Sequence, residues 1–278
     1  MWFGGQGRDG HDRIHLASSS DGTSWAQRGV VLEDPSANHV NDPSVVEVNG
    51  KLFMYYTRAA TGVSDEIAVA TSVDGIQWHR QGTALKPGPA GSWDSFAVGR
   101  PAVIFEEGRF RMWYDGRKDL PPDAPDSDAP KSSTSQRYVG YATSTDGVRW
   151  EKHGSNPVYD HDAGGIHVVR FDGSLLMLIE SRSGTLCARS RDGLLWDGLQ
   201  ELVPRDDEPR ERFGHVTPFL LFDSDRRGAT LFYGGAAAAS WNQNAIRSRR
   251  LSDAQWKMLN AARPGSQAPP PIADGSTH

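Results

Sequence analysis

Short apolar runs, separated by turns of Gly, Asp, Ser and Asn, recur along almost the whole chain. In most units a run that starts with polar residues, such as Asn41-Asp42-Pro43-Ser44-Val45, precedes an aromatic-rich run. Short runs bounded by turn residues are typical of β-strands. The second runs are Met1-Trp2-Phe3, Met54-Tyr55-Tyr56, Met112-Trp113-Tyr114, Met177-Leu178-Ile179 and Leu231-Phe232-Tyr233. The pattern predicts an all-β chain built from repeated groups of strands.

A nine-residue phrase follows each second run. Its four full copies are ASSSDGTSW at 17–25, ATSVDGIQW at 70–78, ATSTDGVRW at 142–150 and ARSRDGLLW at 188–196. A fifth copy near Ser252 keeps Asp253 and Trp256 but lacks the Gly. Asp-Gly favours a tight hairpin turn, because Gly accepts a positive φ and Asp can accept bonds from nearby amides. We therefore interpret Asp21, Asp74, Asp146 and Asp192 as structural, and the Trp as a cover for its hairpin.

The spacing of the phrase determines the predicted fold. Repeats of about 40 to 60 residues indicate a repeat architecture, and four strands per unit correspond to one propeller blade. We predict a single five-bladed β-propeller with four-stranded blades over residues 1–260, followed by a disordered tail over 261–278. The alternative is a β-sandwich whose hairpins are similar by chance. The insert Asp119–Gln136, rich in Pro, Asp and Ser, falls inside the third unit as a lid or a solvated loop.

The first blade is expected to lack its inner strand. Met1 occupies the place that Met54 and Met112 hold within their units. Either a segment after Trp256 supplies the missing strand, or the native chain begins earlier.

Composition limits the classes of partner and the cellular compartment that can be expected. The 278 residues carry a net charge of −5 without a basic block, so nothing favours a nucleic-acid partner. No apolar run approaches the ~20 residues that span a membrane. The single cysteine, Cys187, cannot form an internal disulfide. No signal peptide is recognised. The localisation stays unknown, and cytoplasmic is the expectation for the chain as it stands.

Candidate chemistry gathers where the inner strands should begin, around one mouth of the central channel. Carboxylates that converge on an aromatic-walled pocket suit sugar chemistry, in which one is protonated as an acid and another stays ionised as a base or nucleophile. Each polar residue could instead be a turn, cap or rim residue, and Arg100 requires a carboxylate partner in either case. The candidate catalytic residues are Asp42, Asp94 and Glu180. The candidate substrate contacts are His39, Asn41, Trp93, Arg100, Asp115, His167, Arg182, His215 and Trp241.

The Asn41-Asp42-Pro43-Ser44-Val45 segment, the Met-Trp-Tyr strands and the Ser-x-Asp-Gly-x-x-Trp hairpins resemble the five-bladed propeller glycoside hydrolases of families 32, 43, 62, 68, 117 and 130. The resemblance implies that Asp42 is the base or nucleophile, Asp94 the orienting carboxylate and Glu180 the general acid. Two departures stand out. Asp94 lies six residues before Arg100, and Glu180 lies on a second strand.

The sequence thus predicts a glycosidase, or a related glycan-active enzyme, for a furanoside or small pyranoside, or a glycosylated small molecule. A non-catalytic glycan- or protein-binding propeller and a biosynthetic enzyme that reuses the pocket are the alternatives. No cofactor or metal is expected to be required. The channel could hold a weakly bound ion or a water cluster, and His215 is expected to line the pocket floor as a donor or weak ion contact.

Overall fold

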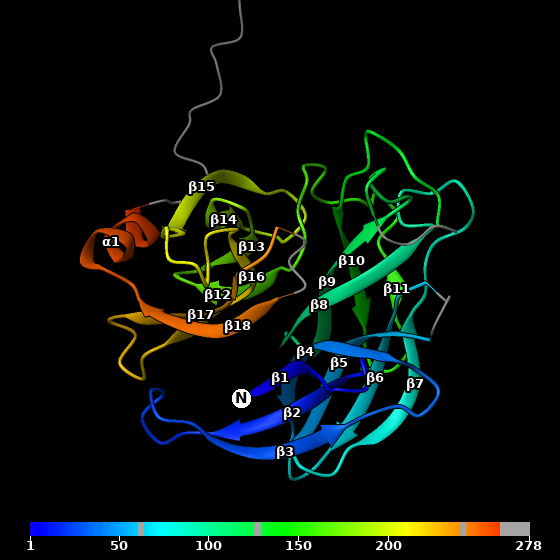
Figure 1. Cartoon of the computed structure of the whole chain (residues 1–278), viewed down its shortest axis with the longest axis horizontal. Helices are drawn as coiled ribbons and strands as arrows, with labels where there is room; N and C mark the ends of the chain where they lie inside the picture. The colour runs from blue at the N-terminus through cyan, green and yellow to red at the C-terminus, as the bar shows by residue number, and fades with distance from the viewer. Residues whose placement is uncertain (61–63, 125–128, 240–242, 262–278) are drawn as a thin grey trace, which may run out of the picture.

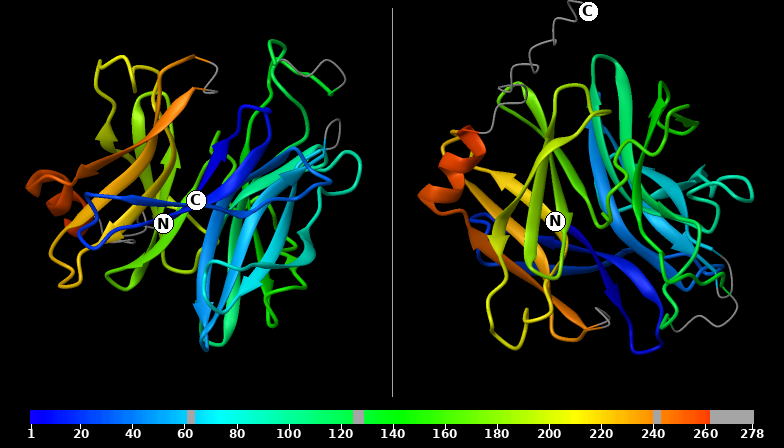
Figure 2. Two further views of the ribbon diagram at one scale, coloured as in Figure 1. Left: turned by 60° about the horizontal axis from the view of Figure 1, so that its bottom comes forward. Right: turned by 90° about the horizontal axis from the view of Figure 1, so that it is seen from above.

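The computed structural model describes residues 1–60, 64–124, 129–239 and 243–261, and these form five small antiparallel sheets and one helix. The sheets follow one another around a ring, from the blue N-terminal sheet to the orange C-terminal one (Figures 1 and 2). The predicted five-bladed β-propeller is confirmed. The inner strands β4, β8, β12 and β16 contact one another in this order around the centre.

The blades have the following strands. Blade 1 contains β1 (Trp2–Gln6), β2 (Asp12–Ser18) and β3 (Ala26–Leu32). Blade 2 contains β4 (His39–Val48), β5 (Lys51–Ala59), β6 (Glu66–Ser72) and β7 (His79–Leu85). Blade 3 contains β8 (Ala97–Glu106), β9 (Arg109–Arg117), β10 (Tyr138–Ser144) and β11 (Glu151–Lys152). Blade 4 contains β12 (His167–Phe171), β13 (Ser174–Glu180), β14 (Gly184–Ser190) and β15 (Asp197–Pro204). Blade 5 contains β16 (His215–Phe222), β17 (Ala229–Ala236) and β18 (Asn244–Arg250), followed by α1 (Asp253–Ala261).

Blades 2, 3 and 4 have the expected four strands, and blade 1 has three, with its aromatic run on β1. Blade 5 departs from the four-strand expectation, because a helix follows β18. The worn phrase explains this difference. Ser252 Oγ accepts from the Gln255 amide at 3.3 Å and Gln255 Oε1 accepts from the Ser252 amide at 2.8 Å, which is a capping box. With Ala254 in place of Gly, the segment starts a helix rather than a turn.

The four full phrases form the turns expected of them. In the first, the Asp21 carboxylate accepts from the amides of Thr23 and Ser24, each at 2.8 Å, and Gly22 has a φ of 71°. The other three full phrases repeat both Asp bonds and the positive φ at Gly. The structural interpretation of these aspartates is confirmed.

The phrases also join neighbouring blades. The carbonyl of a phrase Gly accepts a hydrogen bond from the second-strand aromatic residue of the preceding blade: Trp2 to Gly75 at 2.9 Å, Tyr55 to Gly147 at 2.8 Å and Trp113 to Gly193 at 2.7 Å. Blade 4 has Leu178 and blade 5 has Phe232 at the corresponding position, and neither side chain has a donor. These bonds therefore join blades 1 to 4 only.

The core follows the same division. Four clusters of buried apolar side chains fill the interfaces between blades 1 and 2, 2 and 3, 3 and 4, and 4 and 5. None of these clusters, which the described residues form, joins blade 5 to blade 1. There Phe232 meets the edge of Trp25 with ring centroids 5.9 Å apart. We call this junction the seam.

Tyr55→Phe is expected to lower the free energy of unfolding by about 1 to 2 kcal/mol, because it leaves the buried Gly147 carbonyl without its donor. The measurement is urea denaturation. Tyr138→Phe is the matched control, since the Tyr138 hydroxyl bonds to Gln136 at a solvent-exposed position. Equal losses in both variants would contradict an interblade role for the Tyr55 hydroxyl.

The remaining fold predictions concern the insert of the third unit and the C-terminal tail. The insert lies between β9 and β10 as expected, and all but the first residue of the predicted tail lies outside the described residues. Among the described residues, α1 is the only helix, and it is too short to cross a membrane.

Candidate active site

Backbone bulges place residues from three inner strands at the centre of the ring. Asp42, Arg100 and Thr217 each precede a proline, lie at a register shift of β4, β8 or β16, and have φ values of 54°, 46° and 43°. A left-handed conformation is unusual for Arg and Thr, and the residue before a proline normally prefers the β region. Strained backbone of this kind, like bulges, is often found at functional sites.

Blade 4 contributes a side chain to the same place from its second strand rather than from its inner strand. Gly165 has a φ of 53°, and a Cβ on it would lie 2.0 Å from Glu180 Oε2. The Glu180 carboxyl, which comes from the end of β13, therefore occupies the space that an inner-strand side chain would fill. Glu180 Oε2 also accepts from the Thr217 amide at 3.1 Å, so blade 5 helps to orient it.

Two arginines link the buried carboxylates. Arg100 Nη1 lies 2.9 Å from Asp115 Oδ2. Arg137, directly before β10, donates to Glu180 Oε1, and its Nη1 lies 4.0 Å from Asp115 Oδ2. Asp115 and Glu180 are buried, so both depend on these guanidinium groups for charge compensation. We refer to Arg100, Asp115, Arg137 and Glu180, together with Asp42 and Asp65, whose charges act on Arg100, as the axial cluster.

The buried carboxyl groups of this cluster have pKa values shifted in different directions by their surroundings. Burial alone would raise the pKa of Glu180, but Arg137 and Arg100 outweigh it and hold that pKa below its usual range. Burial raises the pKa of Asp115 although Arg100 and Arg137 oppose the shift. Burial also raises the pKa of Asp65, against the opposing charges of His39 and Arg100. A difference of this kind can separate an ionised group from a proton donor.

Asp42, unlike Asp115 and Glu180, has a carboxylate that no arginine in the described part of the chain contacts. Its half-buried carboxylate makes no hydrogen bond or ion pair with the residues that the structure describes, and only its amide is bound, by Asn41 Oδ1 at 2.9 Å. Its charge nevertheless acts on Arg100, Asp65 and His39. Asn41 packs against Gly4, and His39 Nδ1 lies 2.5 Å from Asp12 Oδ2 in blade 1.

Asp94 lies outside the axial cluster. Successive side chains of a strand point to opposite faces. In β9, Asp115 points to Arg100, whereas Tyr114 and Gly116 point to the other face. Asp94 is on that second face, with Lys152 Nζ at 2.5 Å and the Tyr114 hydroxyl at 3.4 Å.

The aromatic and arginine candidates take separate positions. Trp93 lies on the same face as Asp94, stacked on Tyr114 at 5.9 Å. Trp241 lies outside the described residues. Arg182 is at the rim, where it donates to the Ala239 carbonyl at 3.1 Å.

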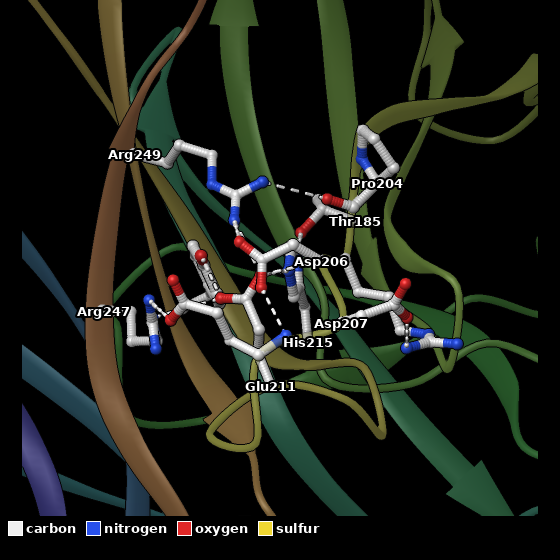
Figure 3. Close-up of polar contacts among 11 residues, drawn as sticks. Thr185, Pro204, Asp206, Asp207, Glu211, His215, Arg247 and Arg249 are labelled. Atoms are coloured by element: carbon white, nitrogen blue, oxygen red, sulfur yellow. Dashed lines mark hydrogen bonds and ion pairs between the residues drawn. The ribbon is translucent and has the colours of Figure 1, made fainter.

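The two histidines are packed against aromatic rings. His167 lies against Phe219 with ring centroids 4.4 Å apart, and burial lowers its pKa to about 4. His215 is fully buried, stacked on Tyr233 at 3.8 Å, with Nδ1 2.9 Å from Thr185 Oγ1. Its Nε2 is 3.8 Å from Glu211 Oε1 (Figure 3). Gly214, directly before His215, packs closely on the neighbouring turn, because a Cβ there would lie 2.2 Å from the Ser181 carbonyl oxygen.

Glu211 is the centre of a second buried network, which the sequence analysis did not identify. Its carboxylate accepts from Tyr233 at 2.7 Å, from Arg249 at 2.7 Å and from the Asp206 amide at 2.9 Å, and Arg247 Nε lies at 3.1 Å (Figure 3). Asp65 and Arg137 were also missed. Arg247 and Arg249, two of the three arginines on β18, were a usable signal for Glu211, because basic residues on a strand that pairs with a buried strand need acidic partners.

No metal site emerges from the described residues, since no group of three or more His, Cys, Asp and Glu side chains there is arranged to hold an ion.

No family model matches the sequence. A 1,2-β-oligomannan phosphorylase of Thermoanaerobacter sp. is 31% identical over 114 residues, which cover 40% of this chain and 36% of the phosphorylase. An uncharacterised Mycobacterium tuberculosis protein, Rv1502, is 28% identical over 225 residues, 69% of each chain. An A type blood N-acetyl-α-D-galactosamine deacetylase of Flavonifractor plautii is 41% identical over 54 residues, and the match covers 16% of this chain and 7% of the deacetylase. The chain thus spans well under two thirds of the phosphorylase and the deacetylase.

Solved structures are similar over most of the chain. Zg3597, a family 117 glycoside hydrolase of Zobellia galactanivorans, has a TM-score of 0.63 at 20% identity. The match covers 86% of this chain and 69% of Zg3597. A thermostable family-43 glycoside hydrolase has a TM-score of 0.63 at 12% identity, covering 90% and 88%. The resemblance to propeller glycoside hydrolases is therefore confirmed for the fold.

Proposed function

We propose that this protein is a glycan-active enzyme of the glycosidase type and that its reaction takes place at the axial cluster. The observation that supports this most is the Asp42 carboxylate, held on a left-handed bulge without a partner among the described residues, beside buried carboxylates that two arginines compensate. Glycoside cleavage needs such a pair of carboxylates in different protonation states. The similar structures, which are glycoside hydrolases, are consistent with this class.

The roles follow from the environment of each carboxylate. We assign Asp42 as the base or nucleophile. Glu180, the general acid by family resemblance, is held ionised by Arg137, which is the opposite of what a proton donor requires. We therefore assign the proton donor to Asp65, whose pKa burial raises, and a positioning role to Glu180 through Arg137. Asp115 replaces Asp94 as the orienting carboxylate, since it contacts Arg100.

The substrate class proposed is a furanoside, a small pyranoside or a glycosylated small molecule, cleaved without a redox cofactor or a required metal. The similarity to a phosphorylase makes inorganic phosphate a second acceptor to test besides water.

The experiment is a screen of aryl glycosides of arabinose, xylose, fructose, galactose and mannose, with and without inorganic phosphate and with EDTA. Turnover is expected for at least one glycoside, and it should survive EDTA. Asp65→Asn should slow substrates with poor leaving groups more than those with good ones, whereas Glu180→Gln should slow both alike. The reverse pattern would return the acid to Glu180. Sugar binding without any turnover would identify a non-catalytic binding module instead.

A further inference from the structure

A second concave site lies beside the axial cluster. It is a pocket of about 540 Å³ lined by Arg182, Arg205, Asp207, Arg212 and Phe213, and we refer to it as the arginine pocket. Arg182 follows Glu180 by two residues, and the Ser181 amide and carbonyl bond to His215 at the start of β16. The pocket therefore opens at the same ends of β13 and β16 that hold the axial cluster.

The backbone holds the walls of this pocket together. A Cβ on Gly214 would lie 2.6 Å from the Cα of Arg182, so the loop that carries Arg212 and Phe213 packs directly on the turn after β13. The Arg205 amide donates to the Ser183 carbonyl at 2.8 Å, which attaches the end of β15 to the same turn. Three segments thus bring the three arginines to one place.

Charge in this region is divided unequally. The loop from Arg205 to Arg212 contains four carboxylates, and three of them turn towards β18: Asp206 pairs with Arg249 at 2.6 Å, Glu208 with Arg247 at 2.8 Å, and Glu211 with both. Figure 3 shows Glu211 and Asp206 gathered beside Arg249, away from Asp207. Only Asp207 remains among the residues that line the pocket, paired with Arg205 at 3.2 Å.

The pocket therefore has three guanidinium groups and one carboxylate. Guanidinium groups bind carboxylate, sulfate and phosphate through paired hydrogen bonds. The Arg212 guanidinium also lies over the Phe213 ring, at 5.2 Å from its centroid, which limits its orientations. An uncharged sugar would form no ion pair with these guanidinium groups, whereas an oxyanion would.

We propose that the arginine pocket binds an oxyanion group, a carboxylate, sulfate or phosphate ester, carried by the glycan that occupies the axial cluster. The preferred substrate is then a glycan that carries an acidic group in addition to the sugar that is cleaved, and neutral aryl glycosides serve as test substrates for the cleavage alone. The link to the axial cluster rests on the proposed function, whereas binding of the anion can be measured by itself.

The test is calorimetric titration of the full chain at low salt with glucose, glucuronate, glucose 6-phosphate and inorganic phosphate. The two anionic sugars should bind more tightly than glucose, and added NaCl should weaken them. Arg205→Ala and Arg212→Ala should each raise the Kd for the anionic sugars by about five- to tenfold. Arg210→Ala is the matched control, since Arg210 lies in the same loop but does not line the pocket.

Equal affinities for glucose and glucuronate would overturn the proposal, and so would an equal loss in Arg210→Ala. Inorganic phosphate that binds as tightly as glucose 6-phosphate would also overturn it, because the anion would then not be carried by the sugar. The two proposals can be separated with the unmodified protein. If it binds glucuronate but turns over no glycoside, the pocket is retained and the glycosidase assignment is rejected. Asp42→Asn should bind glucuronate normally, because Asp42 does not line the pocket.

Discussion

Asp42→Asn is expected to reduce turnover of any glycoside that the protein cleaves by about 10³-fold or more, with little change in KM. The reason is that the amide can neither accept a proton nor attack the anomeric carbon. The backbone should tolerate the change, because Asn adopts the left-handed conformation of Asp42 as readily as Asp does. The measurement is kcat and KM, with circular dichroism to confirm folding.

Asp172→Asn is the matched control. Asp172 also has a positive φ, 46°, but it lies in the turn between β12 and β13, away from the axial cluster. The Asp172→Asn protein should retain full activity and full stability. An Asp42→Asn protein that keeps more than about a tenth of the activity would remove Asp42 from the reaction.

Glu211→Gln is expected to lower the free energy of unfolding by about 3 kcal/mol, the second large effect. Glu211 is fully buried, and its carboxylate accepts from Tyr233, from Arg249 and from the Asp206 amide while pairing with Arg247. The Gln amide would direct an N–H group at the Tyr233 hydroxyl or the Asp206 amide, for which the described residues offer no other acceptor. Arg247 and Arg249 would also lose one carboxylate partner each and keep only Glu208 and Asp206. Urea denaturation of the two proteins measures the difference.

Asp207→Asn provides the comparison for this variant. Asp207 is in the same loop but fully exposed, with Arg205 as its partner. Its removal should leave the denaturation midpoint unchanged, because exposed ion pairs contribute little. Similar midpoints for Glu211→Gln and the unmodified protein would show that the buried network adds no stability.

The fold could be predicted from the sequence because its determinants are local. The hairpin phrase depends on residues within a few positions of Asp21 and of its three counterparts, and the turn it forms requires no knowledge of the rest of the chain. Even the exception follows this rule, since Ala254 and Gln255 convert the last phrase into a helix start. The alternation of apolar and turn segments then leaves the propeller as the favoured arrangement.

The site was predictable only in part, because its geometry depends on distant residues. The Asn-Asp-Pro run correctly indicated an inner strand, but not the bulge at Asp42. Nothing local shows that Gly165 leaves room for a carboxyl from the end of β13, or that Arg137 reaches it from another blade. Asp94 was proposed from the family resemblance and from its place before an inner strand, but the pleat of β9 puts it on the opposite face from Arg100.

The seam between blades 5 and 1 has a consequence for ligand binding. The other four interfaces each bury an apolar cluster. At the seam the described residues form no such cluster, and Trp25 meets Phe232 edge to face. Breathing of the ring should therefore be concentrated there, since this is where separation exposes the least apolar surface. The axial cluster draws on blades 2, 3 and 4, and blade 5 holds one of its members through the Thr217 amide. A ligand that contacts all of these blades would hold blade 5 in place. Ligand binding at the axial cluster and closure of the seam should therefore be thermodynamically coupled.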